Sequence, residues 1–150
     1  MKKILASIQQ GQFDQSQLQR LEALLISSYQ QHVSNDKTIV VWCEIPPGQA
    51  YTAYQPSQSS LITMECPTGF EQQRRVVFLQ SLAEQWMAIT KQHPDYVLLS
   101  LMEEDLFNQF VRSNQKRLSA VGKVRFVLHM LRSFIRSKRR NDLFRFNPNL

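Results

Sequence analysis

The stretch from Ile39 to Cys66 constrains the fold of this 150-residue chain more than any other. It contains two apolar runs, Ile39–Cys43 and Leu61–Cys66, joined by a connector that holds three prolines and one glycine. Neither Pro46 nor Pro47 has a backbone N–H to donate, so the connector must leave regular sheet geometry. We therefore expect two buried strands separated by an irregular arm, in which residues 51–54 alternate enough to form a short hairpin.

Each apolar run belongs to a strand–helix–strand pattern. Leucines recur at helical spacing within Asp14–Val33, and a second amphipathic helix is expected over Glu71–Gln92. The outer strands are expected at Ile4–Ile8 and Val97–Met102. A strand–helix–strand crossover is almost always right-handed and makes its two strands parallel.

The two units resemble each other when the first is shifted by 58 residues. This shift places Ile4 on Ile62 and Gly11 on Gly69, and it matches five further pairs: Leu18 with Val76, Leu21 with Leu79, Leu24 with Leu82, Ile39 with Val97, and Val41 with Leu99. An internal duplication explains the pattern; chance similarity between α/β segments is the alternative. The expected fold class is α/β (α+β): tandem β-α-β units, a four-stranded sheet with two helices on one face, and a C-terminal basic helix.

The four strands are apolar at nearly every position. Strands that alternate poorly are usually covered on both faces of their sheet. Two helices cover one face only, so the other face needs a second copy of the chain, the C-terminal segment, or both.

Charge divides the chain into two parts. Residues 1–111 carry 7 Lys/Arg and 11 Asp/Glu, a balance of −4, whereas residues 112–150 carry 11 Lys/Arg and 1 acidic residue, a balance of +10. We expect an α/β domain over 1–111 and a basic helical extension over 112–150. An electrostatic argument about partners belongs to the extension.

The extension predicts a basic amphipathic helix. Its apolar stripe comprises Val121, Val124, Leu128, Leu131 and Ile135, widened by Val127 and Phe134, among seven Lys and Arg residues. Three partners remain open for residues 121–140: the surface of its own oligomer, the phosphates of a nucleic acid, and an anionic membrane.

Composition and residue spacing indicate the cellular location, the state of the cysteines and the absence of a predicted metal site. No apolar run approaches the roughly 20 residues of a membrane span. The basic start Met1-Lys2-Lys3 is followed by too short an apolar run for a signal peptide, and a cytoplasmic location is expected. Cys43 and Cys66 lack metal-ligand spacing and are expected to be reduced thiols. The histidines are scattered, and the sequence predicts neither a metal nor a cofactor.

A duplicated βαβ pattern, Gly11 after the first strand, and a second strand followed by Pro46-Pro47-Gly48 together resemble the tautomerase superfamily. The similarity is to its fused members, such as malonate semialdehyde decarboxylase and cis-3-chloroacrylic acid dehalogenase, over about residues 2–110. The resemblance implies a β-α-β sandwich assembled as a homotrimer, with pockets at the start of the first strand.

The chain differs from that family at the positions where the family carries its catalytic residues. The resemblance implies an amino-terminal proline that acts as base or nucleophile, but counting back from Gly11 places Lys2 there, and no proline precedes Pro46. Gln12 stands where the family has an arginine. Further arginines that the decarboxylases carry are replaced by residues 66–68.

The candidate catalytic residues are Met1, through its α-amino group, Lys2 and Asp36. The candidate substrate-binding residues are Lys3, Gln12, Tyr51, Tyr54, Arg74 and Arg75. Lysine side chains are almost wholly protonated at neutral pH, so Lys2 would need desolvation or nearby cations to act as a base or Schiff-base amine. Several of these residues have an ordinary alternative. Lys2 and Lys3 can be a solvated strand end, and Asp36 can be a structural loop residue. The two arginines, Arg74 and Arg75, can lie on a solvated helix face. The acidic run 103–105 either caps a helix or activates water.

Two functions follow. The first is a divergent tautomerase-superfamily protein that acts on a small oxo acid by tautomerisation, hydration or decarboxylation, or that has lost catalysis. The second is a non-enzymatic trimeric module whose basic helix binds nucleic acid or an anionic surface.

Overall fold

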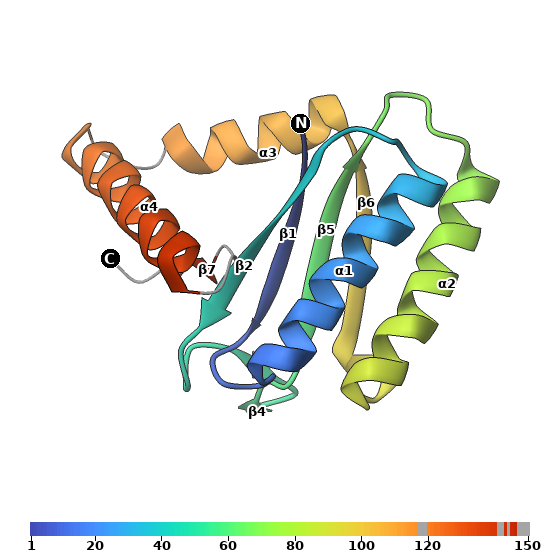
Figure 1. Ribbon diagram of the computed structural model, residues 1–150, viewed down its shortest axis with the longest axis horizontal. Coiled ribbons are helices and arrows are strands. Elements are labelled where there is room, and N and C mark those ends of the chain that lie inside the picture. Colours follow the sequence, from blue (N-terminus) through green and yellow to red (C-terminus); the bar gives the residue numbers. More distant parts are fainter. Residues whose placement is uncertain (117–119, 141–142, 144, 147–150) are drawn as a thin grey trace.

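The computed structural model describes residues 1–116, 120–140, 143 and 145–146 (Figure 1). The first unit consists of β1 (Lys2–Gln9), α1 (Gln15–His32) and β2 (Thr38–Ile45), and the second of β5 (Ser60–Cys66), α2 (Gln72–Thr90) and β6 (Val97–Glu103). Between the units lies the expected hairpin arm, β3 (Tyr51–Thr52) and β4 (Gln55–Pro56). A 3-10 turn (Pro94–Tyr96) precedes β6, and the chain continues through α3 (Glu104–Lys116), α4 (Ala120–Arg140) and β7 (Arg145–Phe146).

The sheet has the order β6-β5-β1-β2-β7. Within each unit the two long strands are parallel, whereas β1 and β5 pair antiparallel and join the units. The predicted four-stranded sheet of tandem β-α-β units is confirmed. A fifth strand of two residues, β7, adds to the edge of β2 and was not expected from the sequence.

Helices α1 and α2 pack side by side on one face of the sheet (Figure 1). Asp14 caps α1 by accepting the Gln17 backbone N–H, at a distance of 2.7 Å. The helices bury leucines and aromatic rings against the core-facing positions of the strands. At the centre the rings of Trp42 and Trp86 stack with centroids 6.4 Å apart, and both are fully buried, as expected for core tryptophans.

The internal duplication holds, but a single shift of 58 residues does not describe it. That shift matches the core-facing residues of β1 and β5, as well as Gly11 and Gly69, which both adopt positive φ. The buried helix positions instead match at a shift of 57: Leu21 with Phe78, Leu25 with Leu82, and Tyr29 with Trp86. The predicted pairing of buried Leu18 with Val76 is therefore wrong, since Val76 lies on the exposed side of α2.

The second strands match at a shift of 59, because Lys2 pairs with Thr38 whereas Ser60 pairs with Val97. Helix α2 and the connection after it are each one residue longer than in the first unit. The extra connecting residue is accommodated by the 3-10 turn before β6. Insertions at helix ends and loops leave both cores intact.

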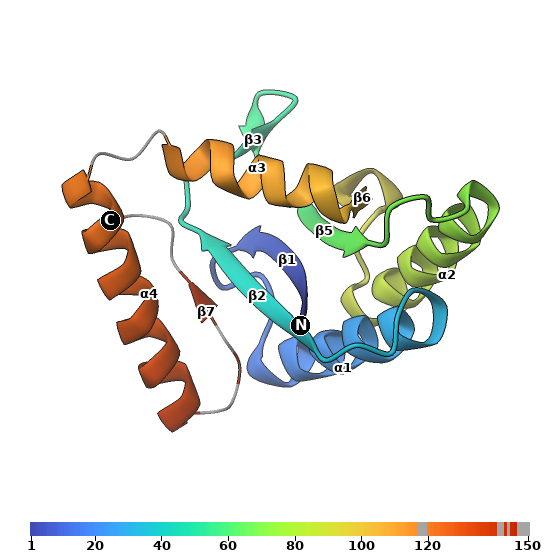
Figure 2. The same ribbon diagram turned by 90° about the horizontal axis from the view of Figure 1, so that it is seen from above.

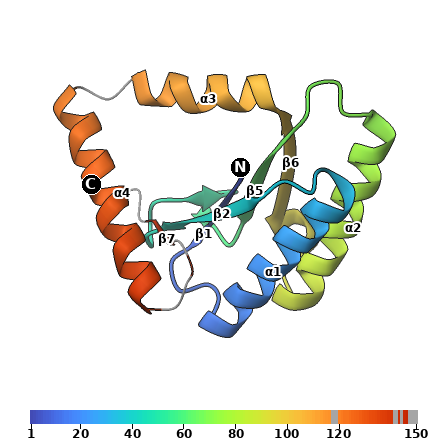
Figure 3. The same ribbon diagram turned by 45° about the horizontal axis from the view of Figure 1, so that its top comes forward.

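The sheet face opposite α1 and α2 is only partly covered. Helix α3 lies on this side and contacts the ends of β5 and β6, while α4 stands beyond β7 at the sheet edge (Figures 2 and 3). Leu61 and Leu98 are neighbours across β5 and β6 and remain 44% and 51% exposed. Helix α3 also runs across the boundary expected at residues 111 and 112.

Replacing Trp86 with alanine should lower the free energy of unfolding by about 3–5 kcal/mol, the usual cost of removing a large buried ring. The change removes the stack on Trp42, the edge contact with Phe13 and the 2.8 Å hydrogen bond to Gln92. Urea unfolding followed by circular dichroism measures the loss. Gln80→Ala, on the exposed side of the same helix, is the control. Equal midpoints for the two variants would contradict the packing.

Candidate functional site

The candidate site lies at the end of the sheet where β1 begins. Because β1 runs antiparallel to β5 and β6, its first residues lie beside the last residues of those two strands. The backbone N–H of Lys2 donates to the carbonyl of Lys37, at 2.9 Å, which fixes the start of β1 against β2. The first residues of α3 also lie at this end of the sheet.

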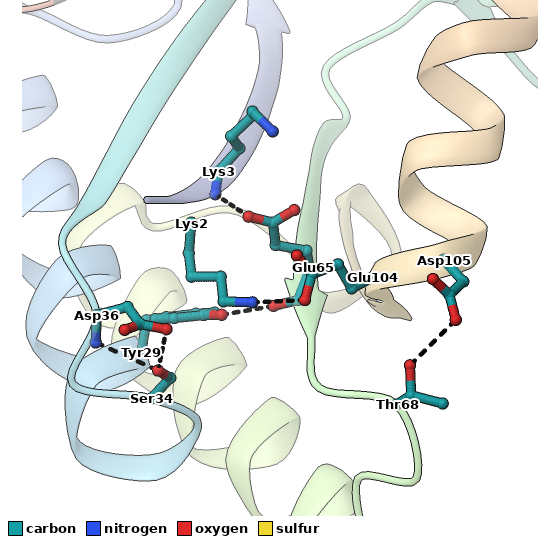
Figure 4. Close-up of polar contacts among 9 residues, drawn as sticks. All are labelled: Lys2, Lys3, Tyr29, Ser34, Asp36, Glu65, Thr68, Glu104 and Asp105. Atoms are coloured by element: carbon teal, nitrogen blue, oxygen red, sulfur yellow. Dashed lines mark hydrogen bonds and ion pairs between the residues drawn. The ribbon is translucent and has the colours of Figure 1, made fainter.

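Side chains replace backbone partners where the pairing of β1 and β5 ends (Figure 4). The last paired residues are Ile4 and Met64. Beyond them the backbone N–H of Lys3 donates to the buried carboxylate of Glu65, at 2.7 Å. The hydroxyl of Tyr29 donates to the Glu65 backbone carbonyl, also at 2.7 Å. Beyond the last backbone pair, β1 and β5 are therefore joined through the Glu65 side chain instead of through backbone hydrogen bonds.

Tyr29 acts here as a hydrogen-bond donor. Burial raises the pKa of its hydroxyl, and the nearby negative charge of Glu65 raises it further. The phenol therefore remains protonated at neutral pH and keeps its hydrogen bond.

An ion pair dominates the electrostatics of the site. Nζ of Lys2 lies 2.8 Å from Oε2 of Glu104, the first residue of α3 (Figure 4). This hydrogen bond is the main cause that raises the pKa of Lys2; partial burial opposes it, and the charges of Glu104, Glu65 and Asp36 support it. A raised pKa opposes the role of neutral base or Schiff-base amine for Lys2.

The carboxylate of Glu104 pairs directly with Lys2 and is influenced at longer range by other positive charges of the first residues. Its pKa is lowered first by the hydrogen bond from Lys2 and by the charge of Lys2, then by Lys3 and by the α-amino group of Met1. Three of the predicted site residues therefore act on one carboxylate. Met1 is exposed, whereas the side chain of Lys2 is 13% exposed.

Asp36 lies in the loop before β2 at the same end of the sheet. Its carboxylate accepts a hydrogen bond from the Ser34 hydroxyl at 2.8 Å, and its backbone carbonyl accepts one from Thr38 at 2.9 Å. The structure thus gives Asp36 a structural part in the loop. Its charge also contributes to the raised pKa of Lys2.

Arg74 and Arg75 reach the same end, but backbone carbonyls bind both guanidinium groups. Arg74 donates to the carbonyl of His32 at 2.9 Å and lies over the ring of Phe70. Arg75 donates to the carbonyl of Leu101 at 2.6 Å and to that of Phe70 at 3.2 Å. Arg74 therefore ties α2 to the end of α1 in the first unit, whereas Arg75 ties α2 to β6 within the second unit.

Cys66 lies fully buried beside Arg75. Burial raises the pKa of the thiol, and the guanidinium partly opposes that shift. Both cysteines are free thiols, as expected. Within the described residues, no group of three or more His, Cys, Asp and Glu side chains is placed to hold a metal ion.

The other predicted site residues lie at the opposite end of the sheet. Gln12 follows β1, and its amide donates to the carbonyl of Gln58 at 2.7 Å. Tyr51 and Tyr54 project from the hairpin arm and are largely exposed. Within one chain the structure does not bring these residues together with Lys2.

Three residues of the site were not among the predicted site residues: Tyr29, Glu65 and Glu104. Glu65 was detectable as the one charged residue in the apolar run Leu61–Cys66. Glu104 could be recognised only once the directions of the strands were known. Because β1 runs antiparallel to β6, the start of β1 lies near the start of α3. Tyr29 looked like an ordinary core residue of α1.

An open depression of about 420 Å³ lies along α3. It is lined by Asp105, Asn108, Gln109, Arg112 and Ser113, so its surface is polar. It begins next to Glu104 but does not include Lys2.

The fold is similar to that of several solved structures, among them a member of the cis-3-chloroacrylic acid dehalogenase family and fused 4-OT. N1, a member of the cis-3-chloroacrylic acid dehalogenase family, matches with a TM-score of 0.61 and 15% identity, over 67% of this chain and 73% of that one. Pt0534 inactivated by 2-oxo-3-pentynoate gives the same score and identity over 67% and 84%. A symmetric trimer of fused 4-OT gives 0.60 and 13% over 67% and 84%. The expected resemblance is thus confirmed in the fold. The sequence matches no known family model and no curated protein.

Replacing Glu104 with glutamine should change how stability depends on pH. The lowered pKa of Glu104 stabilises the fold above the ordinary value of 4.5, and this contribution is lost as the pH falls through the folded pKa. The raised pKa of Lys2 stabilises the fold below 10.5, and this contribution is lost as the pH rises through the folded pKa. The wild type should therefore exceed Glu104→Gln in urea midpoint between these two values, and the difference should close outside them.

Asp105→Asn provides the matched control, because Asp105 is the next residue and its carboxylate accepts a hydrogen bond from the Thr68 hydroxyl, at 3.4 Å, whereas Lys2 pairs with Glu104 (Figure 4). This variant should follow the wild-type pH profile in the alkaline range. If both variants gave the same profile across the whole range, the ion pair would not govern the site.

Proposed function

We propose that this chain is a divergent tautomerase-like enzyme that binds a small oxo acid at the start of β1 and interconverts its keto and enol forms. The observation that carries the proposal is the 2.8 Å ion pair between Lys2 and the carboxylate of Glu104, whose pKa the charge of Lys3 lowers further. An oxo acid presents a carboxylate of the same charge and shape, so it competes with Glu104 for the same cations.

The two amines take different parts in the proposed reaction. Because its pKa is raised, Lys2 stays protonated and stabilises the negative charge that develops on the enolate oxygen. The α-amino group of Met1 takes the proton from the carbon next to the keto group. Returning that proton to the enolate oxygen gives the enol, and the reverse sequence restores the keto form.

Two further observations support the substrate class and the assembly. Pt0534, which shares the fold, is inactivated by 2-oxo-3-pentynoate, itself an oxo acid. Fused 4-OT, which also shares it, forms a symmetric trimer. We propose a trimer for this chain because the sheet face with Leu61 and Leu98 is apolar and incompletely covered.

Replacing Lys2 with methionine tests the chemistry. Methionine is bulky at position 2, so Met1 and its α-amino group are expected to be retained, which mass spectrometry checks. Without the ammonium group, kcat/KM for phenylpyruvate or 2-hydroxymuconate should fall about 10²-fold, as for loss of an oxyanion-stabilising donor. Lys91→Met, at the opposite end of the sheet, should keep wild-type activity. Turnover unaffected by Lys2→Met, or no turnover by the wild type, would contradict the proposed reaction.

Replacing Leu98 with arginine tests the assembly independently. A charge on the exposed apolar face costs desolvation energy in a buried interface, so the variant should sediment as a monomer or dissociate at micromolar concentration. Val77→Arg, at a similarly exposed valine on α2, should leave the assembly unchanged. A wild-type chain that sediments as a folded monomer would contradict the trimer.

A further inference from the structure

Helix α4 presents an apolar stripe to solvent. The stripe comprises six aliphatic residues, each between 49% and 78% exposed: Val121, Val124, Val127, Leu128, Leu131 and Ile135. At 3.6 residues per turn these positions fall within roughly a third of the helix circumference. They form one continuous surface along most of the helix.

The stripe points away from the rest of the chain. The half-buried positions of α4, Gly122, His129 and Met130, lie on the opposite side of the helix. Helix α4 contacts β7, and Leu143, in the segment between them, is buried in the main core. The helix stands at the sheet edge (Figure 2) and is attached to it by one face, and the exposed stripe is the face left over.

Cations border the stripe on both sides. Arg125, Arg132 and Arg136 follow one border and Lys123 lies on the other, and all four are exposed. No acidic residue occurs between 112 and 141, so no carboxylate within α4 itself neutralises this surface. An exposed aliphatic face between basic borders is the pattern of helices that lie in a membrane interface.

We propose that α4 docks this chain on an anionic lipid surface, with the stripe buried among the acyl chains and the bordering cations at the headgroups. No described helix is long and apolar enough to cross a membrane, and α4 therefore lies on the bilayer rather than through it.

Two other partners fit the stripe less well. A nucleic acid would use the cations, but six aliphatic side chains offer its bases nothing to stack on. A second α4 packed against the first would bring the basic borders of both helices together, which like-charge repulsion opposes. Anionic lipid uses both the apolar stripe and the charge.

Flotation of the full-length protein with vesicles tests the proposal. Wild-type protein should float with phosphatidylcholine–phosphatidylserine vesicles, and less so with phosphatidylcholine alone or at high salt. Leu128→Gln/Leu131→Gln should weaken binding to the anionic vesicles by about tenfold or more, because it removes apolar area from the centre of the stripe. Val76→Gln/Val77→Gln, two exposed valines of α2, should bind as the wild type does.

Arg132→Gln/Arg136→Gln provides a second test that leaves the apolar stripe intact. It should weaken binding to anionic vesicles and leave any binding to neutral vesicles unchanged. Equal binding of wild type and both α4 variants would overturn the proposal. So would dissociation of the oligomer by Leu128→Gln/Leu131→Gln, which assigns the stripe to a second copy, or retention of nucleic acid without vesicle binding.

Discussion

The antiparallel pairing of β1 with β5 determines where everything else in this protein lies. Each βαβ unit on its own has parallel strands, and its polar ends would lie apart from those of the other unit. Joining the units through β1 and β5 brings the start of β1 to the ends of β5 and β6. Lys2 can therefore reach Glu104, although 102 positions separate them in sequence.

The duplicated architecture makes the two ends of the sheet comparable, and they differ in chemistry. Ser60 opens β5 as Lys2 opens β1. Around Ser60 the contacts are between neutral groups: its hydroxyl donates to Gln92 at 3.1 Å, and the amides of Gln92 and Gln12 both donate to the Gln58 carbonyl. Around Lys2 they are ionic. The proposed anion site depends on the ammonium group of Lys2, and Ser60, its counterpart in the second unit, carries no charge.

Sequence patterns identified the strands and helices of both units because each pattern reports on burial along one element. Trp42 on β2 and Trp86 on α2, for example, both fall at buried positions of such patterns. The shift between the two helices was predicted wrongly. One residue separates Gly11 from Phe13, whereas Phe70 directly follows Gly69, so the second helix begins one residue earlier. The spacing of leucines within each helix does not reveal this difference. Strand β7 has two residues and carries no periodic signal at all.

The site was harder to predict than the fold because its partners come from different units. Met1, Lys2, Lys3 and Asp36 were chosen as candidates and do lie at one end of the sheet. Glu104, the ion-pair partner of Lys2, becomes their neighbour only through the pairing of β1 and β5. Gln12 and Tyr54 lie toward the other end of β1 and are separated from Lys2 by the length of that strand.

Glu104 has two sources of stabilisation, and this bears on how a ligand could replace it. As the first residue of α3 it lies at a helix N-terminus, where a carboxylate interacts favourably with the helix dipole. As the partner of Lys2 it also neutralises a partly buried ammonium group. If an oxo acid takes over the second interaction, Glu104 keeps the first, and because its side chain is 47% exposed it also gains contact with water. Such an exchange keeps one carboxylate against the Lys2 ammonium group while adding one negative charge to the site, and it does not require α3 to unfold.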